Sequence, residues 1–328
     1  MPAARTAIAC FGEALIDFLA EPEAGDGRPP RFACNAGGAP ANVAVGIARL
    51  GGNARFAGML ATDMFGDYLL GELHAHGVDT TATRRTDAAP TALAFVSLAA
   101  GGERSFSFYR PPAADLLFTV ADFDDDLFAG LAAFHACSNS LTEPDIAAAT
   151  MHGMRRAAAA GAVASFDINL RPALWPREVD PAPVVWKALE HAQLVKLSRE
   201  ELAFLARDVG EDAAVARLLA HAEVVLATDG AAPIRWWTRS ASGSAPTFAV
   251  QSIDTTAAGD AFVAALLQRI AGHGVDAGTL GFAFDDAGLR DDILRHAAAA
   301  GALATTALGA FAAMPAAAEV RALLAESA

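Results

Sequence analysis

The chain has 328 residues, of which 54% are hydrophobic and 19% are charged, and this composition excludes an intrinsically disordered chain. The length suits one large α/β domain or about two average domains. Lysine and arginine number 24 and aspartate and glutamate 38, so the formal net charge is −14. This charge repels a phosphate backbone and an anionic membrane surface, so we expect neither nucleic acid nor a membrane as partner. A small anionic ligand would need local cations or backbone N–H groups.

Cysteine spacing and the apolar runs indicate the setting in which the protein works. Cys10, Cys34 and Cys137 are far apart and contain no CxxC pair, so they encode neither a metal knuckle nor a redox pair. Residues 1–9 lack the basic start and long apolar stretch of a signal peptide. The alanine-rich runs are interrupted well before the ~18 apolar residues that a membrane span needs. We therefore expect a cytoplasmic protein.

The first part of the chain predicts two buried strands, each followed by a helix. The strands are the apolar runs at residues 6–11 and 54–60. Pro40 suits the first turn of the first helix, where its missing N–H would have no partner within the helix. The second helix covers residues 63–76, with Asp63 as its N-cap.

The pattern then changes to one that predicts a small sheet. Residues 93–98 and 105–109 are two strand-like runs on either side of Gly101 and Gly102, which is typical of a β-hairpin. No helix fits between them. Together with residues 20–32, this hairpin would form a small sheet apart from the main body.

Beyond residue 115 strands and helices alternate, which indicates a mostly parallel sheet covered by helices on both faces. Ligands of such sheets bind beyond the carboxyl ends of the strands. The predicted strands are 132–137, 162–168, 193–197 and 224–228, followed by a late antiparallel pair at 234–238 and 247–250. The predicted helices are 143–160, 198–207, 212–221, 258–271 and 289–306.

The segment from Asp254 to Phe262 carries the strongest chemical signal. A helix begins within it, so the N–H groups of Ala257, Ala258 and Gly259 lie at a helix N-terminus, where unpaired donors and the helix dipole favour an anion. Asp260 is then either an acid that stabilises the first turn or a general base beside an anion hole. The motif alone leaves both interpretations open.

Two further segments are candidates for ligand contact. Gly37 and Gly38 let a backbone approach a ligand closely, and Asn42 both donates and accepts hydrogen bonds; the alternative is a loop and helix cap. Asn169 and Arg171 follow a predicted strand, at the edge where a sheet binds its ligand. Arg171 would supply a local cation, and the alternative there is a turn with an N-cap aspartate.

Arg110 and the segment from Lys196 to Glu201 have simpler local explanations. Arg110 ends the predicted hairpin, where it either reaches a ligand or is a solvated edge charge. Ser198 and Glu201, three residues apart at the start of a helix, form a capping box pattern. The eight histidines have no metal-ligand spacing, and no GxSxG, Walker A or HExxH motif occurs.

Taken together and in this order, these segments resemble the ribokinase-like (PfkB) carbohydrate kinase family from about residue 7 to 315. The most diagnostic stretches are 37–51 and 254–262, and residues 12–17, 108–110 and 167–175 look most like the fructokinase branch. The resemblance implies an α/β fold, a ribokinase-like mostly parallel sheet sandwiched by helices. It implies one kinase domain over 1–328, with a small β-sheet lid formed by about 18–33 and 90–112.

The resemblance also implies a chemistry: transfer of the γ-phosphoryl group of Mg-ATP to a hydroxyl of fructose. Asp260 would accept the hydroxyl proton, and the amides of Ala257, Ala258 and Gly259 would hold the developing negative charge. The sugar-binding positions of the family match Asp17, Gly37, Gly38, Asn42, Arg110, Asn169 and Arg171. Nucleotide-side positions match Ser198, Glu201, Thr228, Gly230 and Gly259, with Glu201 acting on Mg²⁺ through water. Asp254 and Thr256 lie where many members hold a monovalent cation such as K⁺.

Several departures from the family pattern bear on these expectations. Ala257 replaces the usual glycine, and its N–H is expected to serve the anion hole only at negative φ. Ser198 replaces an asparagine, the turn after Thr228 lacks its second glycine, and Ala298 stands where asparagine is frequent. The nucleotide side is therefore the part of the site where the pattern is most altered.

Three alternatives stay open. A family kinase for 2-keto-3-deoxygluconate, ribose or a nucleoside would share these motifs, and Arg110 with Arg171 would suit an acidic sugar. A sugar-binding protein without turnover would explain Ala257. A dinucleotide oxidoreductase would share the strand–helix alternation, but no GxGxxG follows the first strand. Because family members often dimerise through their lid sheets, the resemblance also implies a homodimer.

Overall fold

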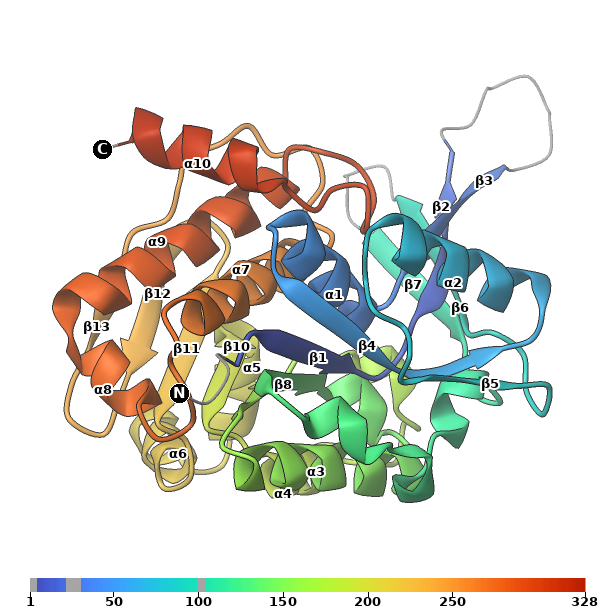
Figure 1. Cartoon of the computed structure of the whole chain (residues 1–328), viewed down its shortest axis with the longest axis horizontal. Coiled ribbons are helices and arrows are strands. Elements are labelled where there is room, and N and C mark those ends of the chain that lie inside the picture. Colours follow the sequence, from blue (N-terminus) through green and yellow to red (C-terminus); the bar gives the residue numbers. More distant parts are fainter. Residues whose placement is uncertain (1–4, 22–30, 99–103, 328) are drawn as a thin grey trace.

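The computed structural model describes residues 5–21, 31–98 and 104–327. Over these residues the main sheet has nine strands in the order β13-β12-β11-β10-β9-β8-β1-β4-β5 (Figure 1). All neighbouring pairs are parallel except β11 with β12 and β12 with β13. The strands are β1 (Ala7–Phe11), β4 (Asn53–Ala61), β5 (Thr83–Thr86), β8 (Leu131–Cys137), β9 (Val163–Asp167), β10 (Leu194–Ser198), β11 (Val224–Asp229), β12 (Ala232–Trp237) and β13 (Ser242–Ala245).

The central strand β1 shows why the sheet is covered on both faces. Successive side chains of a strand point to opposite faces. Ala7, Ala9 and Phe11 accordingly pack in one apolar core, and Ile8 and Cys10 pack in the other. A strand that is buried on both faces reads as one continuous apolar run, which is how the sequence presents it.

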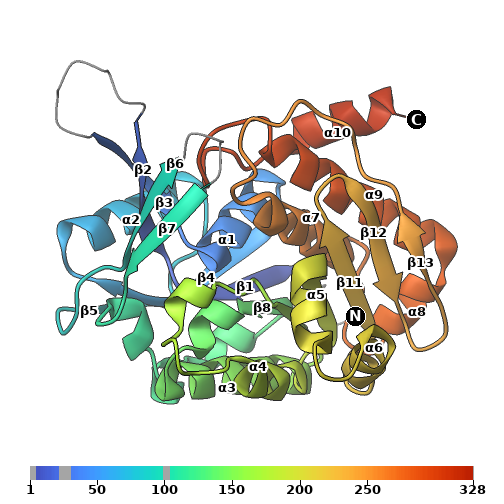
Figure 2. The same cartoon turned by 180° about the vertical axis from the view of Figure 1, so that it is seen from behind.

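The helices form two layers, one on each face of the sheet (Figures 1 and 2). The Phe11 face is covered by α3 (Pro144–Ala159), α4 (Ala182–Leu189), α5 (Arg199–Ala206) and α6 (Glu211–Leu219). The Ile8 face is covered by α1 (Ala39–Arg49), α2 (Met64–Ala75), α7 (Ala258–Gly272), α8 (Leu280–Asp285) and α9 (Ala287–Ala304), and α10 (Ala317–Glu326) packs on α9. Short 3₁₀ helices lie at Ala114–Leu117, Val120–Asp122, Asp125–Phe128, Ser138–Leu141 and Pro172–Leu174. The predicted fold class, a mostly parallel sheet between helices, is confirmed.

A separate small sheet stands beside this body, as the sequence predicts (Figure 2). Its order is β3-β2-β6-β7, from β2 (Leu15–Ala20), β3 (Phe32–Gly37), β6 (Leu93–Leu98) and β7 (Arg104–Tyr109). β6 and β7 are antiparallel, with Leu93 opposite Tyr109, so the expected hairpin pairing is present. The expected turn at Gly101 and Gly102 and residues 22–30 of the predicted lid lie outside the described residues.

The prediction of a strand at residues 247–250 is wrong. The strand that pairs with β12 is β13, at Ser242–Ala245, and residues 247–250 are irregular. The reason is a steric fit between Trp236 and Gly243, which face each other across the pair. A Cβ on Gly243 would lie 2.7 Å from the Trp236 indole, so the indole requires a glycine opposite it. Phe248 instead packs against the apolar core from the loop.

Candidate active site

The candidate site lies where the strand order reverses. From β1 the chain adds β4 and β5 on one side, and later returns to place β8 on the other side. Ligands of open α/β sheets bind at such a point, beyond the carboxyl ends of the strands. The loop after β9, the starts of α1, α5 and α7 and the turn after β11 carry most of the residues predicted from the sequence.

Asp260 and Asn42 meet at this point although 218 residues separate them in the chain. The Asn42 amide nitrogen donates to Asp260 Oδ2 at 2.7 Å. The contact depends on close packing of α1 against α7, because a Cβ on Gly46 would lie 2.6 Å from the Ala264 side chain. The pKa of Asp260 is raised to about 6, chiefly by burial and also by Asp167, while the Asn42 hydrogen bond opposes the rise. A carboxyl with this pKa is suited to proton transfer near neutral pH.

The helix N-terminus beside Asp260 has a backbone that differs from the sequence-based expectation. Ala257 is the N-cap of α7 and lies in the left-handed region, at φ 58° and ψ 9°. The condition stated for the Ala257 N–H, a negative φ, is therefore not met. Physically, a left-handed residue next to a right-handed one turns successive N–H groups toward one concave side, which binds anions. This geometry is suited to hold an anion, so the stretch from Ala257 to Gly259 is named the anion-binding turn; its alanine stands where glycine would be less strained.

The two predicted glycines of the Gly37–Gly38 turn are required by protein groups. A Cβ on Gly37 would overlap the Asp17 carboxylate. Gly38, at φ 103°, would place a Cβ 2.6 Å from the Glu13 carbonyl oxygen. The turn therefore brings β3 of the small sheet and the start of α1 against the loop after β1, and it holds Asp17 at the junction between the small sheet and the body.

Arg110 is buried in an ion pair, so the alternative of a solvated edge charge is wrong. Its Nε donates to Asp115 Oδ2 at 2.8 Å, and Nη2 also contacts that oxygen. Its Nη1 donates to the Asn139 carbonyl oxygen at 2.9 Å. Glu13 lies close enough to raise the pKa of Arg110 together with Asp115. The guanidinium is thus neutralised within the protein.

Asn169 and Arg171 lie on the loop after β9 but differ in exposure. Asn169 is buried and has a positive φ of 37°, a conformation that asparagine tolerates better than most residues. Arg171 is exposed and lies near enough to Asp260 to lower the pKa of that carboxyl. Of the two predicted arginines, Arg171 is therefore the one whose charge acts on Asp260.

Ser198 and Glu201 form the predicted capping box at the start of α5. The Ser198 N–H donates to Glu201 Oε2 at 2.7 Å, and the Glu201 N–H donates to Ser198 Oγ at 3.2 Å. Glu201 Oε1 also accepts from the Leu170 N–H at 2.7 Å, which links α5 to the loop after β9. Burial and Asp167 raise the pKa of Glu201. Each carboxylate oxygen keeps a second lone pair, so Glu201 fits as acceptor for a metal-bound water.

Two of the residues predicted for the nucleotide lie in and after β11, and those predicted for the monovalent cation lie just before α7. Gly230 has a φ of 52° in the turn between β11 and β12, and Thr228 lies in β11 next to a hollow of about 300 Å³. Asp254 accepts hydrogen bonds from the N–H groups of Thr256, at 2.7 Å, and Gly309, at 3.2 Å. The Thr256 hydroxyl is buried without a hydrogen-bond partner. An unpaired oxygen beside a carboxylate is chemically suited to a cation such as K⁺.

Several buried polar groups at this edge, beyond the predicted Asn42, were not predicted as site residues from the sequence. Glu13, Asn139 and Asp167 each have one side-chain oxygen that is buried without a hydrogen-bond partner, as do Asp115 and Asn42. Buried polar atoms are rarely left unpaired in native proteins, so this concentration indicates space for a polar ligand or water. The signal in the sequence was a charged residue beside a buried apolar strand, as at Glu13 after β1.

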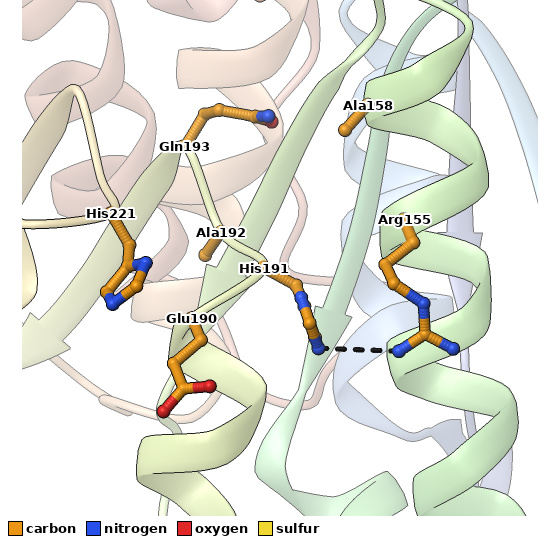
Figure 3. Close-up of a pocket in the computed structure, with 7 residues that line it drawn as sticks. All are labelled: Arg155, Ala158, Glu190, His191, Ala192, Gln193 and His221. Carbon is orange, nitrogen blue, oxygen red and sulfur yellow. Dashed lines mark hydrogen bonds between the residues drawn. The ribbon is translucent and has the colours of Figure 1, made fainter.

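Another hollow, of about 220 Å³, lies at the amino ends of the strands, opposite the candidate site (Figure 3). His191 and Gln193 precede β10 and His221 precedes β11, so these residues lie at the amino ends of the strands. Figure 3 shows Arg155 of α3 reaching His191, at 3.3 Å between Nη1 and Nε2. This hollow contains none of the predicted site residues.

Within the described ranges, none of the helices is long and apolar enough to cross a bilayer. In the same part of the chain, no group of three or more histidine, cysteine, aspartate or glutamate residues is arranged to hold a metal ion.

The fold, the anion-binding turn and the raised pKa of Asp260 are the features expected of a phosphotransferase that acts on a hydroxyl group. The chain belongs to the pfkB family of carbohydrate kinases, whose match covers residues 5–317. It is 41% identical over 332 residues to fructokinase-1 of Zea mays, covering 99% of each chain.

Two solved structures show how closely the architecture is shared. The fructokinase of Xylella fastidiosa with bound ATP is 52% identical, with a TM-score of 0.94 over 98% of this chain and 99% of that one. The fructokinase of Vibrio cholerae O395, bound to fructose, ADP and a calcium ion, is 31% identical, with a TM-score of 0.85 over 98% and 99% of the two chains.

Proposed function

We propose that this carbohydrate kinase phosphorylates fructose with ATP. The observation that carries the proposal is the contact between Asn42 and Asp260 beside the anion-binding turn of α7, at 2.7 Å. The fructokinases similar to this chain, which include proteins bound to ATP or to fructose with ADP, support the same substrates.

In the proposed reaction a sugar hydroxyl oxygen attacks the γ-phosphorus and its proton passes to the Asp260 carboxylate. The bond between the γ-phosphorus and the β,γ-bridging oxygen breaks, and ADP leaves. The amides of Ala257, Ala258 and Gly259 stabilise the negative charge on the transferred group. Phosphoryl transfer depends chiefly on such positioning and electrostatic stabilisation, so the chain needs no covalent intermediate.

The proposed metal is Mg²⁺, which neutralises phosphate charge and brings ordered waters when it enters with ATP. Glu201 would accept hydrogen bonds from those waters through the second lone pairs of its oxygens. Ser198 fixes Glu201 by the capping box, at 2.7 and 3.2 Å. Thr228 and Gly230 would lie along the nucleotide. Asp254 and the unpaired Thr256 hydroxyl are proposed to hold K⁺.

The sugar is proposed to bind between the small sheet and the body, so that the small sheet acts as a lid on one kinase domain. Asp17, Asn42 and Asn169 would contact its hydroxyls, and Gly37 and Gly38 would keep the turn close to it. Arg171 would contact the transferred phosphoryl group. Because Asp115 neutralises Arg110, Arg110 would act by holding the loop after β8 rather than by binding a carboxylate. This arrangement favours a neutral sugar over an acidic one such as 2-keto-3-deoxygluconate.

The proposed setting is the cytoplasm, which supplies ATP and keeps thiols reduced; the three cysteines are unpaired. A homodimer through the small sheet is also proposed. Phe32 and Tyr109 of this sheet are 40% and 66% exposed, and both contact Phe95. Light scattering on the wild type and on Tyr109→Asp tests the dimer. A monomeric wild type would contradict it.

The function is tested by coupled ADP release from Mg-ATP over a panel of fructose, ribose, 2-keto-3-deoxygluconate and a nucleoside, with and without K⁺. We expect turnover on fructose, stimulated by K⁺, and a loss of about 10²–10⁴-fold in Asp260→Asn. Preference for 2-keto-3-deoxygluconate would contradict the substrate assignment. Sugar binding without ADP release by the folded wild type would contradict the proposed activity.

A further inference from the structure

Lys196 is a charged residue in the middle of an otherwise apolar buried strand. Its neighbours in β10, Leu194, Val195 and Leu197, are fully buried, and the Lys196 side chain is only 8% exposed. Removing an ammonium from water is unfavourable unless a partner compensates it. The burial of the Lys196 ammonium therefore requires a partner, and the capping box of Ser198 and Glu201 does not supply one.

The choice of lysine at this position stands out against the rest of the sequence. Of the 24 basic lysine and arginine residues, only Lys187 and Lys196 are lysines. Lys187 lies in the last turn of α4, whereas Lys196 lies at the candidate site. Lysine carries a compact point charge on a flexible stem, whereas arginine carries a planar fork that needs more room. The space around Lys196 fits a compact ammonium group better than a planar guanidinium group.

Two groups enclose the ammonium. The first is Asp167 at the end of the adjacent strand β9, where Lys196 and Asp167 are register partners and Nζ lies 3.0 Å from Oδ2. The second is the first turn of α7, because a Cβ on Gly259 would lie 3.0 Å from Nζ. Gly259 thus leaves space for the ammonium directly behind the amides of the anion-binding turn.

The charges around this pair come from several elements. Asp260 on α7 is faced by Asp167 from β9, Lys196 from β10, Arg171 from the loop after β9, Asn42 from α1 and Cys137 from β8. Glu201 of α5 faces the same pair. His135 of β8 lies behind it, and its Nδ1 is 3.0 Å from Ser165 Oγ; burial lowers the pKa of His135 to about 4, so it is neutral. Lys196 is therefore the buried cation among three carboxyl groups.

We propose that Lys196 is a positioning residue for phosphoryl transfer, whose ammonium, held by Asp167 against Gly259, places positive charge behind the amides that face the transferred phosphoryl group. The inference rests on the proposed roles of Asp260 and the anion-binding turn. Asp167 balances the charge before ATP enters. When the phosphoryl group arrives, the ammonium attracts it through the backbone of Gly259, in an environment where water screens little.

The kinetic test compares Lys196→Met with the double variant Asp167→Asn/Lys196→Met and with the surface control Lys187→Met. We expect Lys196→Met to lower kcat about 10–100-fold with little change in the KM for fructose. Its acid limb of kcat/KM should move to higher pH, because Asp260 loses a neighbouring cation while Asp167 remains. The double variant should return the acid limb toward the wild-type pH but leave kcat low, and Lys187→Met should behave as wild type.

The double variant also guards against a folding artefact, because it removes both charges and leaves no uncompensated carboxylate. Wild-type kcat in the double variant would overturn the proposal, since the pair would then be only structural. An unchanged kcat and acid limb in Lys196→Met would overturn it as well. If the wild type itself fails to phosphorylate any sugar, the proposed function fails instead, so the two failures are distinguishable.

A second readout does not depend on turnover. Protein labelled with ¹⁵N only in lysine has two Nζ signals, and Lys187→Met assigns them. We expect the Lys196 signal to shift when Mg-ATP is added to Asp260→Asn, which binds without reacting, while the Lys187 signal stays in place. A Lys196 signal that does not respond to the nucleotide contradicts the proposed electrostatic contact.

Discussion

Replacing Asp260 with asparagine should make the protein more stable at neutral pH. Asp260 has a pKa of about 6 in the folded protein against 3.8 for an ordinary aspartate. The folded state therefore binds this proton more tightly, and stability falls as pH rises from 3.8 to about 6. At 1.36 kcal/mol per pKa unit, the ionised carboxylate lowers the free energy of unfolding by about 3 kcal/mol above pH 6. Asn keeps the shape and a hydrogen bond to Asn42 without this penalty.

The assay is urea unfolding of wild type and Asp260→Asn at pH 7.5 and pH 5. We expect the variant to be more stable by up to about 3 kcal/mol at pH 7.5 and by about half as much at pH 5. Asp63→Asn is the matched control. Asp63 caps α2 and hydrogen bonds with Thr91, Gly66 and Phe65 lower its pKa, so its replacement should reduce stability equally at both pH values. An Asp260→Asn variant that is no more stable than wild type, or whose gain does not depend on pH, would refute the burial argument.

Three further outcomes follow from the site. The acid limb of kcat/KM should lie near pH 6, where Asp260 loses its proton, and a limb near pH 4 in a pH–rate profile would contradict the burial of this carboxyl. Ala257→Gly should raise the free energy of unfolding by about 1 kcal/mol, because glycine adopts the left-handed conformation without strain. Ala258→Gly, at the first position of α7, should lower it by about the same amount. Urea unfolding measures both changes, and two changes in the same direction would contradict the assigned backbone. Arg110→Met should lose about 3–5 kcal/mol because it leaves the Asp115 carboxylate buried and unpaired, and Arg110→Met/Asp115→Leu should recover part of that loss in the same assay; a double variant less stable than Arg110→Met would argue against a buried ion pair.

Local sequence pattern predicted most of the fold because the buried strands are short apolar runs bounded by glycine or polar residues. It failed at residues 247–250, where Phe248 packs against the core from a loop instead of a strand. Pattern analysis cannot show that Trp236 requires a glycine opposite it, since that requirement comes from contact across two strands. α4, α8 and α10 were not predicted for a different reason: they have only 8, 6 and 10 residues, so the helical period repeats few times in each.

Sequence analysis predicted many residues of the candidate site but few of the contacts between them. The capping box at Ser198 follows from a local spacing, and Asn42 and Asp260 were predicted as separate site residues, but their hydrogen bond was not predicted. The burial of Arg110 against Asp115 depends on how the loop after β7 folds back, which no local pattern encodes. Lys196 was visible as a charge in an apolar run, but its role needs the position of Gly259, 63 residues later.

The contact between Asn42 and Asp260 also has a consequence for the order in which the protein folds. α7 begins at Ala258 of 328 residues. β1 pairs with β4, which lies between the two halves of the small sheet along the chain, and with β8, which follows both halves. Contacts of such long sequence separation form slowly and late. Until synthesis passes residue 260, the chain therefore lacks the contact between Asn42 and Asp260. In a refolding time course, recovery of turnover should lag behind recovery of helical signal, so enzymatic activity reports the last step of assembly.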